Sequence, residues 1–189
     1  MKTILLDIDG VIANFDAALL DVLKYIHNID IDLMKLKSWD IFDIPEVRVL
    51  ENDIFRCIEM SRAIYNMDLY DGAIEFVDTL RIMGRVIACT ASIYPTTFPS
   101  ERAAWLIGKV GFNVNDIIFA KDKSMVKGDV FIDDNLSNII NWGAENPSSL
   151  ALHFQTPFRN VIPTQALPGN VNSCTDYKDA LEQIKRKFK

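Results

Sequence analysis

The feature that most constrains this chain is the point where its first apolar run ends in acidic residues. The run at residues 4–6 is followed by Asp7, Asp9 and Gly10. Such a run predicts a buried strand, and the reactive groups of open α/β sheets gather at the carboxyl ends of their strands. Residues two apart on an extended segment share a face, so these carboxylates repel each other unless a cation or a shared proton compensates. The spacing therefore predicts a bound metal.

A second buried-strand pattern, at residues 85–89, ends in a turn that bears hydroxyl groups. It leads into Thr90, Ala91 and Ser92. The hydroxyls and backbone amides of such a turn can bind phosphate oxygens. Each feature also has a purely structural interpretation: an Asp at a strand end is more often a turn former or helix cap, and Thr90 could simply close a strand.

A third buried-strand pattern, at residues 129–132, ends in the adjacent carboxylates Asp133 and Asp134, and Lys123 lies shortly before it. Carboxylates from the first and third strand ends can bind a hard cation through oxygen, and a lysine can bind phosphate. The structural alternatives are a helix cap for the acidic pair and a solvated lysine in a charged cluster. Three strand ends with complementary groups favour a chemical site.

Taken in chain order, the first acidic motif, the threonine, the lysine and the last acidic pair resemble the four motifs of the haloacid dehalogenase (HAD) superfamily of phosphatases. DIDGVIANF at residues 7–15 and KDKSMVKGDVFIDD at residues 121–134 resemble the 5'(3')-deoxyribonucleotidases more specifically. The likeness extends to about residue 143. One departure is Ala91, where the family commonly has a serine. A phosphate-binding hydroxyl is therefore missing, although the Ala91 amide can donate and Ser92 is a candidate substitute.

The resemblance implies a Mg²⁺-dependent phosphomonoester hydrolase that dephosphorylates deoxyribonucleoside monophosphates through an aspartyl-phosphate. Asp7 is then the nucleophile and Asp9 the general acid and base. The implied metal-binding residues are Asp7, Asp9, Asp133 and Asp134, with Asp134 favoured as the direct ligand, and the implied phosphate-binding residues are Thr90, Ala91 and Lys123.

Aromatic residues near the first motif are candidates for contact with a nucleobase. The resemblance places Phe15 beside the substrate, and Trp39 and Phe42 fall where the family has aromatic base contacts. Tyr65 is a further substrate-binding candidate. An aromatic ring can stack on a base, but burial in the core is an equally good explanation for each of these side chains.

Other functions remain open at this point. The runner-up is a HAD-type phosphatase of another small ester, such as a sugar phosphate, and a non-catalytic nucleotide-binding module is a weaker alternative that rests on Ala91. A response-regulator receiver also combines an Asp pair, a Thr and a Lys. Its acidic pair lies on the first strand, however, whereas the adjacent pair here comes last. The sequence does not distinguish deoxyribose from ribose, 5' from 3' esters, or one base from another.

The predicted fold is α/β, a Rossmann-like, mostly parallel sheet with helices on both faces and a small helical cap inserted after the first strand. We expect a catalytic core at residues 1–13 and 72–189 and the cap at 14–71. Apolar residues at helical spacing predict cap helices near residues 15–26 and 47–58.

Further along the chain, alternating patterns predict additional helices and strands. The expected helices are 73–83, 100–110, 136–143 and 177–188, and the expected strands include 117–120 and 150–154. Residues from 155 to Thr175 are expected to form a surface loop.

Composition limits the partners and the compartment. The formal net charge of −6 argues against extended nucleic-acid binding, and the 189 residues lack a membrane span or signal peptide, which favours a cytoplasmic enzyme with a small-molecule substrate. Three widely spaced cysteines predict neither a disulfide framework nor a zinc site. His27 and His153 have no partner at metal or triad spacing in the sequence. Oligomeric state is left open.

Overall fold

A single parallel sheet organises the chain. The structure is a computed structural model that describes residues 1–35, 40–92, 97–156 and 167–189. The described strands form one six-stranded sheet in the order β3-β2-β1-β4-β5-β6, and every neighbouring pair is parallel. The strands are β1 (Thr3–Leu6), β2 (Arg85–Thr90), β3 (Ile117–Phe119), β4 (Val130–Asp133), β5 (Leu150–Phe154) and β6 (Val171–Cys174). The predicted α/β fold with a parallel sheet is confirmed.

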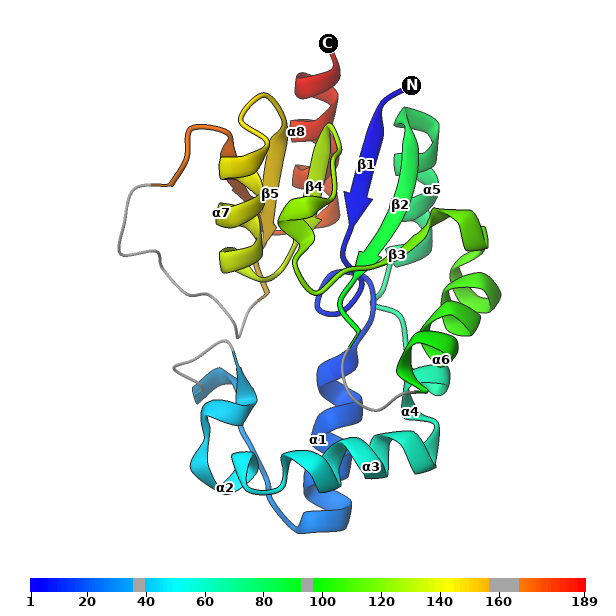
Figure 1. Cartoon of the computed structure of the whole chain (residues 1–189), viewed down its shortest axis with the longest axis vertical. Coiled ribbons are helices and arrows are strands. Elements are labelled where there is room, and N and C mark those ends of the chain that lie inside the picture. Colours follow the sequence, from blue (N-terminus) through cyan, green and yellow to red (C-terminus); the bar gives the residue numbers. More distant parts are fainter. Residues whose placement is uncertain (36–39, 93–96, 157–166) are drawn as a thin grey trace.

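The helices fall into two groups along the chain. Between β1 and β2 lie α1 (Phe15–His27), α2 (Pro45–Arg48), α3 (Glu51–Ser61), α4 (Ala63–Asn66) and α5 (Ala73–Met83), and after β2 come α6 (Phe98–Trp105), α7 (Leu136–Glu145) and α8 (Tyr177–Phe188). In Figure 1, α1, α2 and α3 lie together beyond the end of the sheet toward which β1 points, while both termini lie at the opposite end. Among the described residues, no helix combines the length and apolarity of a membrane span.

Packing on both faces explains why the strands are almost wholly apolar. Ile4, Leu5 and Leu6 of β1 have no exposed surface. On one face, the sheet packs against α5 and α8, and on the other, the α7 residue Trp142 lies in a cluster with Phe131 of β4. Strands covered on both sides lose the alternation of polar and apolar residues that a half-exposed strand shows.

The centre of the sheet is a topological switch point. β1 lies between β2 and β4, so the chain moves outward from β1 in both directions. Crevices that bind ligands form at the carboxyl ends of strands at such a point. The ends of β1, β2 and β4 are the positions where the sequence places its acidic and hydroxyl residues.

The helices beyond the sheet have a core of their own. Leu19 and Leu23 of α1 pack in one buried cluster with Ile54 and Ile58 of α3, and Phe98 of α6 joins this cluster. The Asn14 side chain caps α1 by accepting a hydrogen bond from the Ala17 N–H group at 3.2 Å. The cap stabilises the start of α1. The apolar contact holds α1 against α3.

Three local expectations differ from the structure. The stretch expected as a loop from residue 155 to Thr175 contains β6, an edge strand in which the central Asn172 and Ser173 are exposed, so it lacks an apolar run. The stripe at residues 47–58 is split into α2 and α3. The helix expected at 100–110 starts at Phe98 and continues beyond α6 as a π-helical segment, Leu106–Val110.

Candidate active site

The ends of β1 and β4 bring three carboxylates together. The Asp7 N–H group donates to the Ile132 carbonyl oxygen of β4 at 2.9 Å, which continues the sheet past the end of β1. Asp7 therefore lies beside Asp133 and Asp134. Each of these three buried residues has a carboxylate oxygen within 4.8 Å of those of the other two. Such closely spaced oxygens are suited to a hard divalent cation.

Lys123 lies between two of these carboxylates. Its Nζ is 2.8 Å from Asp7 Oδ1 and 2.7 Å from Asp133 Oδ2, and the residue is only 4% exposed. Burial opposes the charge of the Lys123 ammonium, but Asp7 and Asp133 outweigh it and raise its pKa above the usual range. Lys123 is therefore a buried cation and not a solvated member of a charged surface cluster.

At Asp7, in contrast to Lys123, the effect of burial on the pKa outweighs that of the opposite charge. Burial raises the pKa of its carboxyl, the nearby Asp133 charge raises it further, and the Lys123 ammonium lowers it, with a net value of about 6. Burial and the Asp133 charge thus make the ionised form of Asp7 less favourable than it is in water, and added positive charge would stabilise that form. A bound cation would supply that charge.

The two residues of the Asp133–Asp134 pair differ in their surroundings. Asp133 has no exposed surface, and it accepts hydrogen bonds from Lys123 Nζ, from the Asn135 N–H group at 2.7 Å and from Asn138 Nδ2 at 3.1 Å. Asp134 instead lines the cavity described below. Asp133 is therefore held within the protein, whereas Asp134 faces the space that a ligand can enter.

Gly10 lets the loop after β1 approach Asp134. Its φ is +75°, and a Cβ at this position would overlap the Asp134 carboxylate. Only glycine combines this backbone conformation with so close a contact. The glycine of the first motif is thus required by the packing of two acidic segments against each other, which supports the interpretation of this site as a cation cradle.

The Asp9 carboxylate is paired with an arginine that sequence reasoning did not single out. Arg102 Nη2 lies 2.6 Å and 2.8 Å from the two carboxylate oxygens of Asp9. Arg102 is fully buried on α6, with its guanidinium about 5.0 Å from the Phe98 ring centroid. Burial raises the pKa of Asp9 and the Arg102 charge opposes this shift, with a net increase. The Asp9 carboxylate is fixed in orientation and inclined to hold a proton.

The end of β2 supplies the hydroxyl and amide groups. Thr90 is buried and lines the cavity, and its hydroxyl donates only a long 3.5 Å hydrogen bond to the Ala91 carbonyl oxygen. Ala91 also lines the cavity, but Ser92 is exposed and is absent from the described lining. Ser92 therefore does not replace the missing hydroxyl at position 91 in this conformation.

These groups face a cavity of about 380 Å³ between the sheet and the helices beyond it. Its lining includes the acidic residues Asp7, Asp9 and Asp134 and the aromatic residues Phe15, Phe42 and Phe55. The rings of Phe42 and Phe55 pack against each other with centroids 5.3 Å apart. A volume of this size is in the range of small-molecule sites.

The aromatic candidates are thus divided by the structure. Phe15 and Phe42 line the cavity, whereas Trp39 falls outside the described residues. Tyr65 does not belong to the described lining: it is 42% exposed on α4, and its ring lies against the Arg62 guanidinium at 4.8 Å. The expected substrate contact of Tyr65 is not supported, because the residue is absent from the described lining of this cavity.

His153 contacts the backbone of the site residue Asp134. Its Nε2 lies 3.1 Å from the Asp134 carbonyl oxygen, and burial lowers the pKa of the ring, which favours a neutral imidazole that donates this hydrogen bond. The histidine was expected to have no functional partner, and its contact is with backbone alone. It fixes the main chain that carries Asp134.

Comparisons with known proteins agree with this geometry. The family model described as "5' nucleotidase, deoxy (Pyrimidine), cytosolic type C protein" matches residues 1–161. A Bordetella bronchiseptica protein named "Putative 5'(3')-deoxyribonucleotidase" is 29% identical over 163 residues, which cover 82% of this chain and 84% of that protein. A Bordetella pertussis protein of the same name is 28% identical over the same shares.

Solved structures show the same fold. A haloacid dehalogenase-like hydrolase of Burkholderia xenovorans matches with a TM-score of 0.67 at 15% identity, covering 99% of this chain and 98% of that one. A HAD-hydrolase of Bacillus subtilis, described as bound to magnesium, matches with a TM-score of 0.59 at 15% identity over 97% and 98% of the two chains. The family match extends over most of the chain and includes every acidic motif residue described above. This chain belongs to the deoxy (pyrimidine), cytosolic type C family of 5'-nucleotidases.

Proposed function

We propose that this phosphatase hydrolyses deoxyribonucleoside monophosphates with the help of Mg²⁺ and through an aspartyl-phosphate intermediate. The observation that carries the proposal is the meeting of Asp7, Lys123 and the Asp133–Asp134 pair beneath a cavity with aromatic walls. An acidic cluster alone would suit any cation. The buried lysine and the adjacent Thr90 add the groups that a phosphate ester requires.

Asp7 and Asp9 divide the reaction between them. A carboxylate oxygen of Asp7 attacks phosphorus and forms the aspartyl-phosphate as the bond to the leaving oxygen breaks. Asp9 gives its proton to that oxygen, and then takes a proton from the water that attacks the intermediate and releases phosphate. The raised pKa of Asp9 suits a group that begins the cycle protonated. Arg102 is a positioning residue that acts through Asp9.

The metal would be held by Asp7, by Asp134 and by the backbone carbonyl of Asp9, with Asp133 behind them. Mg²⁺ supplies positive charge that offsets the repulsion between an anionic nucleophile and an anionic phosphate. Asp133 binds Lys123 and so holds the ammonium at the site. Lys123, Thr90 and the Ala91 amide then stabilise charge on the phosphate oxygens.

The segment at residues 14–71 is assigned as the cap of this enzyme, and residues 1–13 and 72–189 as its catalytic core. The apolar cluster of α1 and α3 is distinct from the two clusters on the sheet, which supports this division, although Phe98 of the assigned core joins it. Phe15 and Phe42 come from the cap and line the cavity, where a flat base could stack. A sugar phosphate has no such ring, and it is therefore the alternative substrate that these side chains favour less.

Phosphate release from a substrate panel tests the proposal. We expect Mg²⁺-dependent release from dTMP and dUMP, slower release from the ribonucleotides, and at least about tenfold lower kcat/KM for a sugar phosphate, a difference of about 1.4 kcal/mol. Chelation of the metal with EDTA should abolish release, and added Mg²⁺ should restore it. Preference for the sugar phosphate would reject the nucleotide pocket but keep the chemistry of Asp7. Absence of turnover with every substrate would favour a binding module.

Replacement of Phe15 by Ala should raise KM for dTMP by about tenfold, because stacking on a base contributes about 1–3 kcal/mol. KM for a small phosphate ester without a ring should change much less. Tyr65→Ala is the matched control, since this aromatic residue lies outside the described cavity lining. Steady-state kinetics with both substrates measures the difference. Equal increases in KM for the two substrates would exclude base stacking at Phe15.

A further inference from the structure

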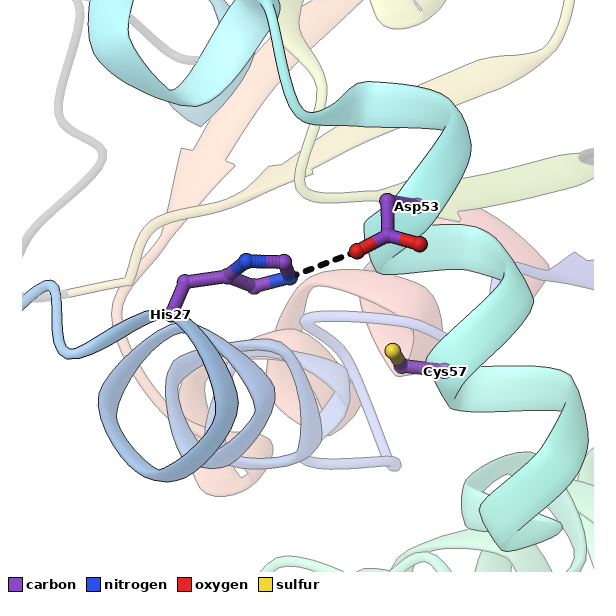
Figure 2. Close-up of side chains that lie close together, drawn as sticks. All are labelled: His27, Asp53 and Cys57. Carbon is purple, nitrogen blue, oxygen red and sulfur yellow. Dashed lines mark ion pairs between the residues drawn. The ribbon is translucent and has the colours of Figure 1, made fainter.

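A second group of metal-binding side chains lies away from the active site. His27, at the last turn of α1, faces Asp53 and Cys57 of α3, as Figure 2 shows. Asp53 and Cys57 are four residues apart, so they lie on the same face of α3. One ligand atom from each of the three residues lies within 4.8 Å of the other two. This cluster was not expected from the sequence, in which His27 and Cys57 are far apart.

The imidazole of His27 is not satisfied by its surroundings. Its Nε2 is buried and forms no hydrogen bond to the described residues. Asp53 Oδ2 lies 3.5 Å away, at ion-pair distance but without hydrogen-bond geometry. A buried polar nitrogen normally has a partner, because burial without one is unfavourable. The nitrogen points at the Asp53 carboxylate, and the Cys57 thiol lies on the same side of α3 (Figure 2).

The donor set selects a particular class of metal. A nitrogen, an oxygen and a sulfur donor suit Zn²⁺, which takes three protein ligands and a water in a tetrahedral site. Metal–ligand bonds of about 2.0–2.3 Å place neighbouring donors roughly 3.4–3.7 Å apart, and the His27–Asp53 distance is already 3.5 Å. Mg²⁺ prefers oxygen ligands and does not compete for a thiolate.

We propose that His27, Asp53 and Cys57 form a zinc site that joins the end of α1 to α3. Asp53 is half exposed, with 54% of its side-chain surface accessible, so the ion and its water ligand can enter from solvent. The two joined helices also carry Phe15 and Phe55, which line the active-site cavity. The zinc site is independent of the reaction proposed above, but it would stiffen the wall that contacts the substrate.

Cobalt substitution tests the site without relying on activity. Protein saturated with Mg²⁺ is titrated with Co²⁺, and a thiolate-to-cobalt charge-transfer band is followed in the near ultraviolet. We expect one equivalent of Co²⁺ to produce the band and one equivalent of Zn²⁺ to displace it. Cys57 is the candidate thiol, since Cys89 and Cys174 are buried in the core and burial raises the pKa of each to about 12.

Variants then identify the ligands. Cys57→Ser should eliminate the cobalt band, and His27→Gln should weaken Zn²⁺ binding at least tenfold in competition with a chromogenic chelator. Cys174→Ala is the matched control and should keep both the band and the affinity. Circular dichroism establishes that each variant is folded. Absence of the band in the wild-type protein, or unchanged Zn²⁺ affinity in folded Cys57→Ser, would overturn the proposal whatever the phosphatase assays give.

Discussion

Replacement of Asp7 by Asn should lower kcat for phosphate release by at least about 10⁴-fold, a magnitude typical for loss of an enzyme nucleophile. The amide nitrogen and oxygen of Asn cannot form the acyl-phosphate bond, although Asn occupies the same space. Single-turnover and steady-state phosphate release with dTMP measure the loss. A variant that retains more than a hundredth of the wild-type rate would exclude Asp7 as the nucleophile.

The stability of Asp7→Asn shows whether its loss of activity comes from the missing nucleophile or from a destabilised fold. Burial and the nearby Asp133 raise the pKa of Asp7 to about 6, above its usual value. A group with a raised pKa stabilises the folded state when protonated, and this contribution is lost as the pH rises through about 6. Asn resembles the protonated form, so in EDTA at pH 7 the Asp7→Asn protein should be at least as stable as the wild type. A lower melting temperature would contradict this electrostatic account.

Asp129→Asn is the matched control for the activity measurement. This residue precedes β4 at the opposite end of the sheet, where its carboxylate accepts hydrogen bonds from Lys2 and from the Thr3 N–H group. The Thr3 N–H group and the Lys2 ammonium lower the pKa of Asp129. The substitution should therefore cost some stability and leave kcat unchanged. Asp7→Asn should therefore lose activity and keep its stability, whereas Asp129→Asn should keep its activity and lose some stability. The difference arises because the two carboxylates lie at opposite ends of the same sheet.

Much of the fold follows from local sequence patterns. The apolar run before Asp7 gave β1, and helical periodicity with flanking caps gave α5 and α8 with their observed bounds. These elements are visible because their burial is continuous and their ends carry turn-forming residues. β6 was missed for the opposite reason: an edge strand pairs on one side only, so Asn172 and Ser173 can remain exposed.

The parts of the candidate site that the sequence missed are long-range contacts. Arg102 and Asp9 are 93 residues apart, and nothing in the helical segment around Arg102 distinguishes it from a solvated arginine. His27 and Cys57 come from different helices and meet only after α1 packs on α3. Predicting either pairing requires the tertiary packing of the helices, which local sequence patterns do not contain. The sequence shows which residues carry charged or metal-binding groups, but not which of them lie close together in the folded protein.

The different surroundings of Asp7 and Asp9 explain how two neighbouring acids could perform different tasks. Asp7 bonds to a lysine that also binds Asp133, so its charge is balanced inside a cluster. Asp9 bonds to one buried arginine and lies outside that cluster. Burial raises the pKa of both groups, and a neighbouring carboxylate raises each further, Asp133 for Asp7 and Asp7 for Asp9, but of the two acids only Asp7 belongs to the cluster of carboxylates that can bind a cation. One acid is thereby prepared for attack and metal binding, the other for proton transfer.

Lys123→Met should have the largest effect on stability of any single substitution in the site. It leaves Asp7 and Asp133 buried without the ammonium that lies between them, a loss of about 3–5 kcal/mol in the free energy of unfolding. It should also lower kcat by more than about 10²-fold, because a cation beside the transferred phosphate is lost. Lys127→Met is the matched control. This exposed lysine donates a hydrogen bond to the Glu145 carbonyl oxygen, and its replacement should change stability by less than about 0.5 kcal/mol.

The pH dependence and a second substitution distinguish charge imbalance from lost packing. Without Lys123, the pKa of Asp7 should rise further, so urea denaturation in EDTA should give a smaller loss at pH 5 than at pH 8. Addition of Asp133→Asn to Lys123→Met removes one of the unpaired charges and should recover a large part of the lost stability. Met preserves most of the apolar volume of the lysine stem. A loss that is independent of pH and unaffected by Asp133→Asn would therefore mean that Lys123 supports the fold through packing, and that the carboxylates are not held at the site by its charge.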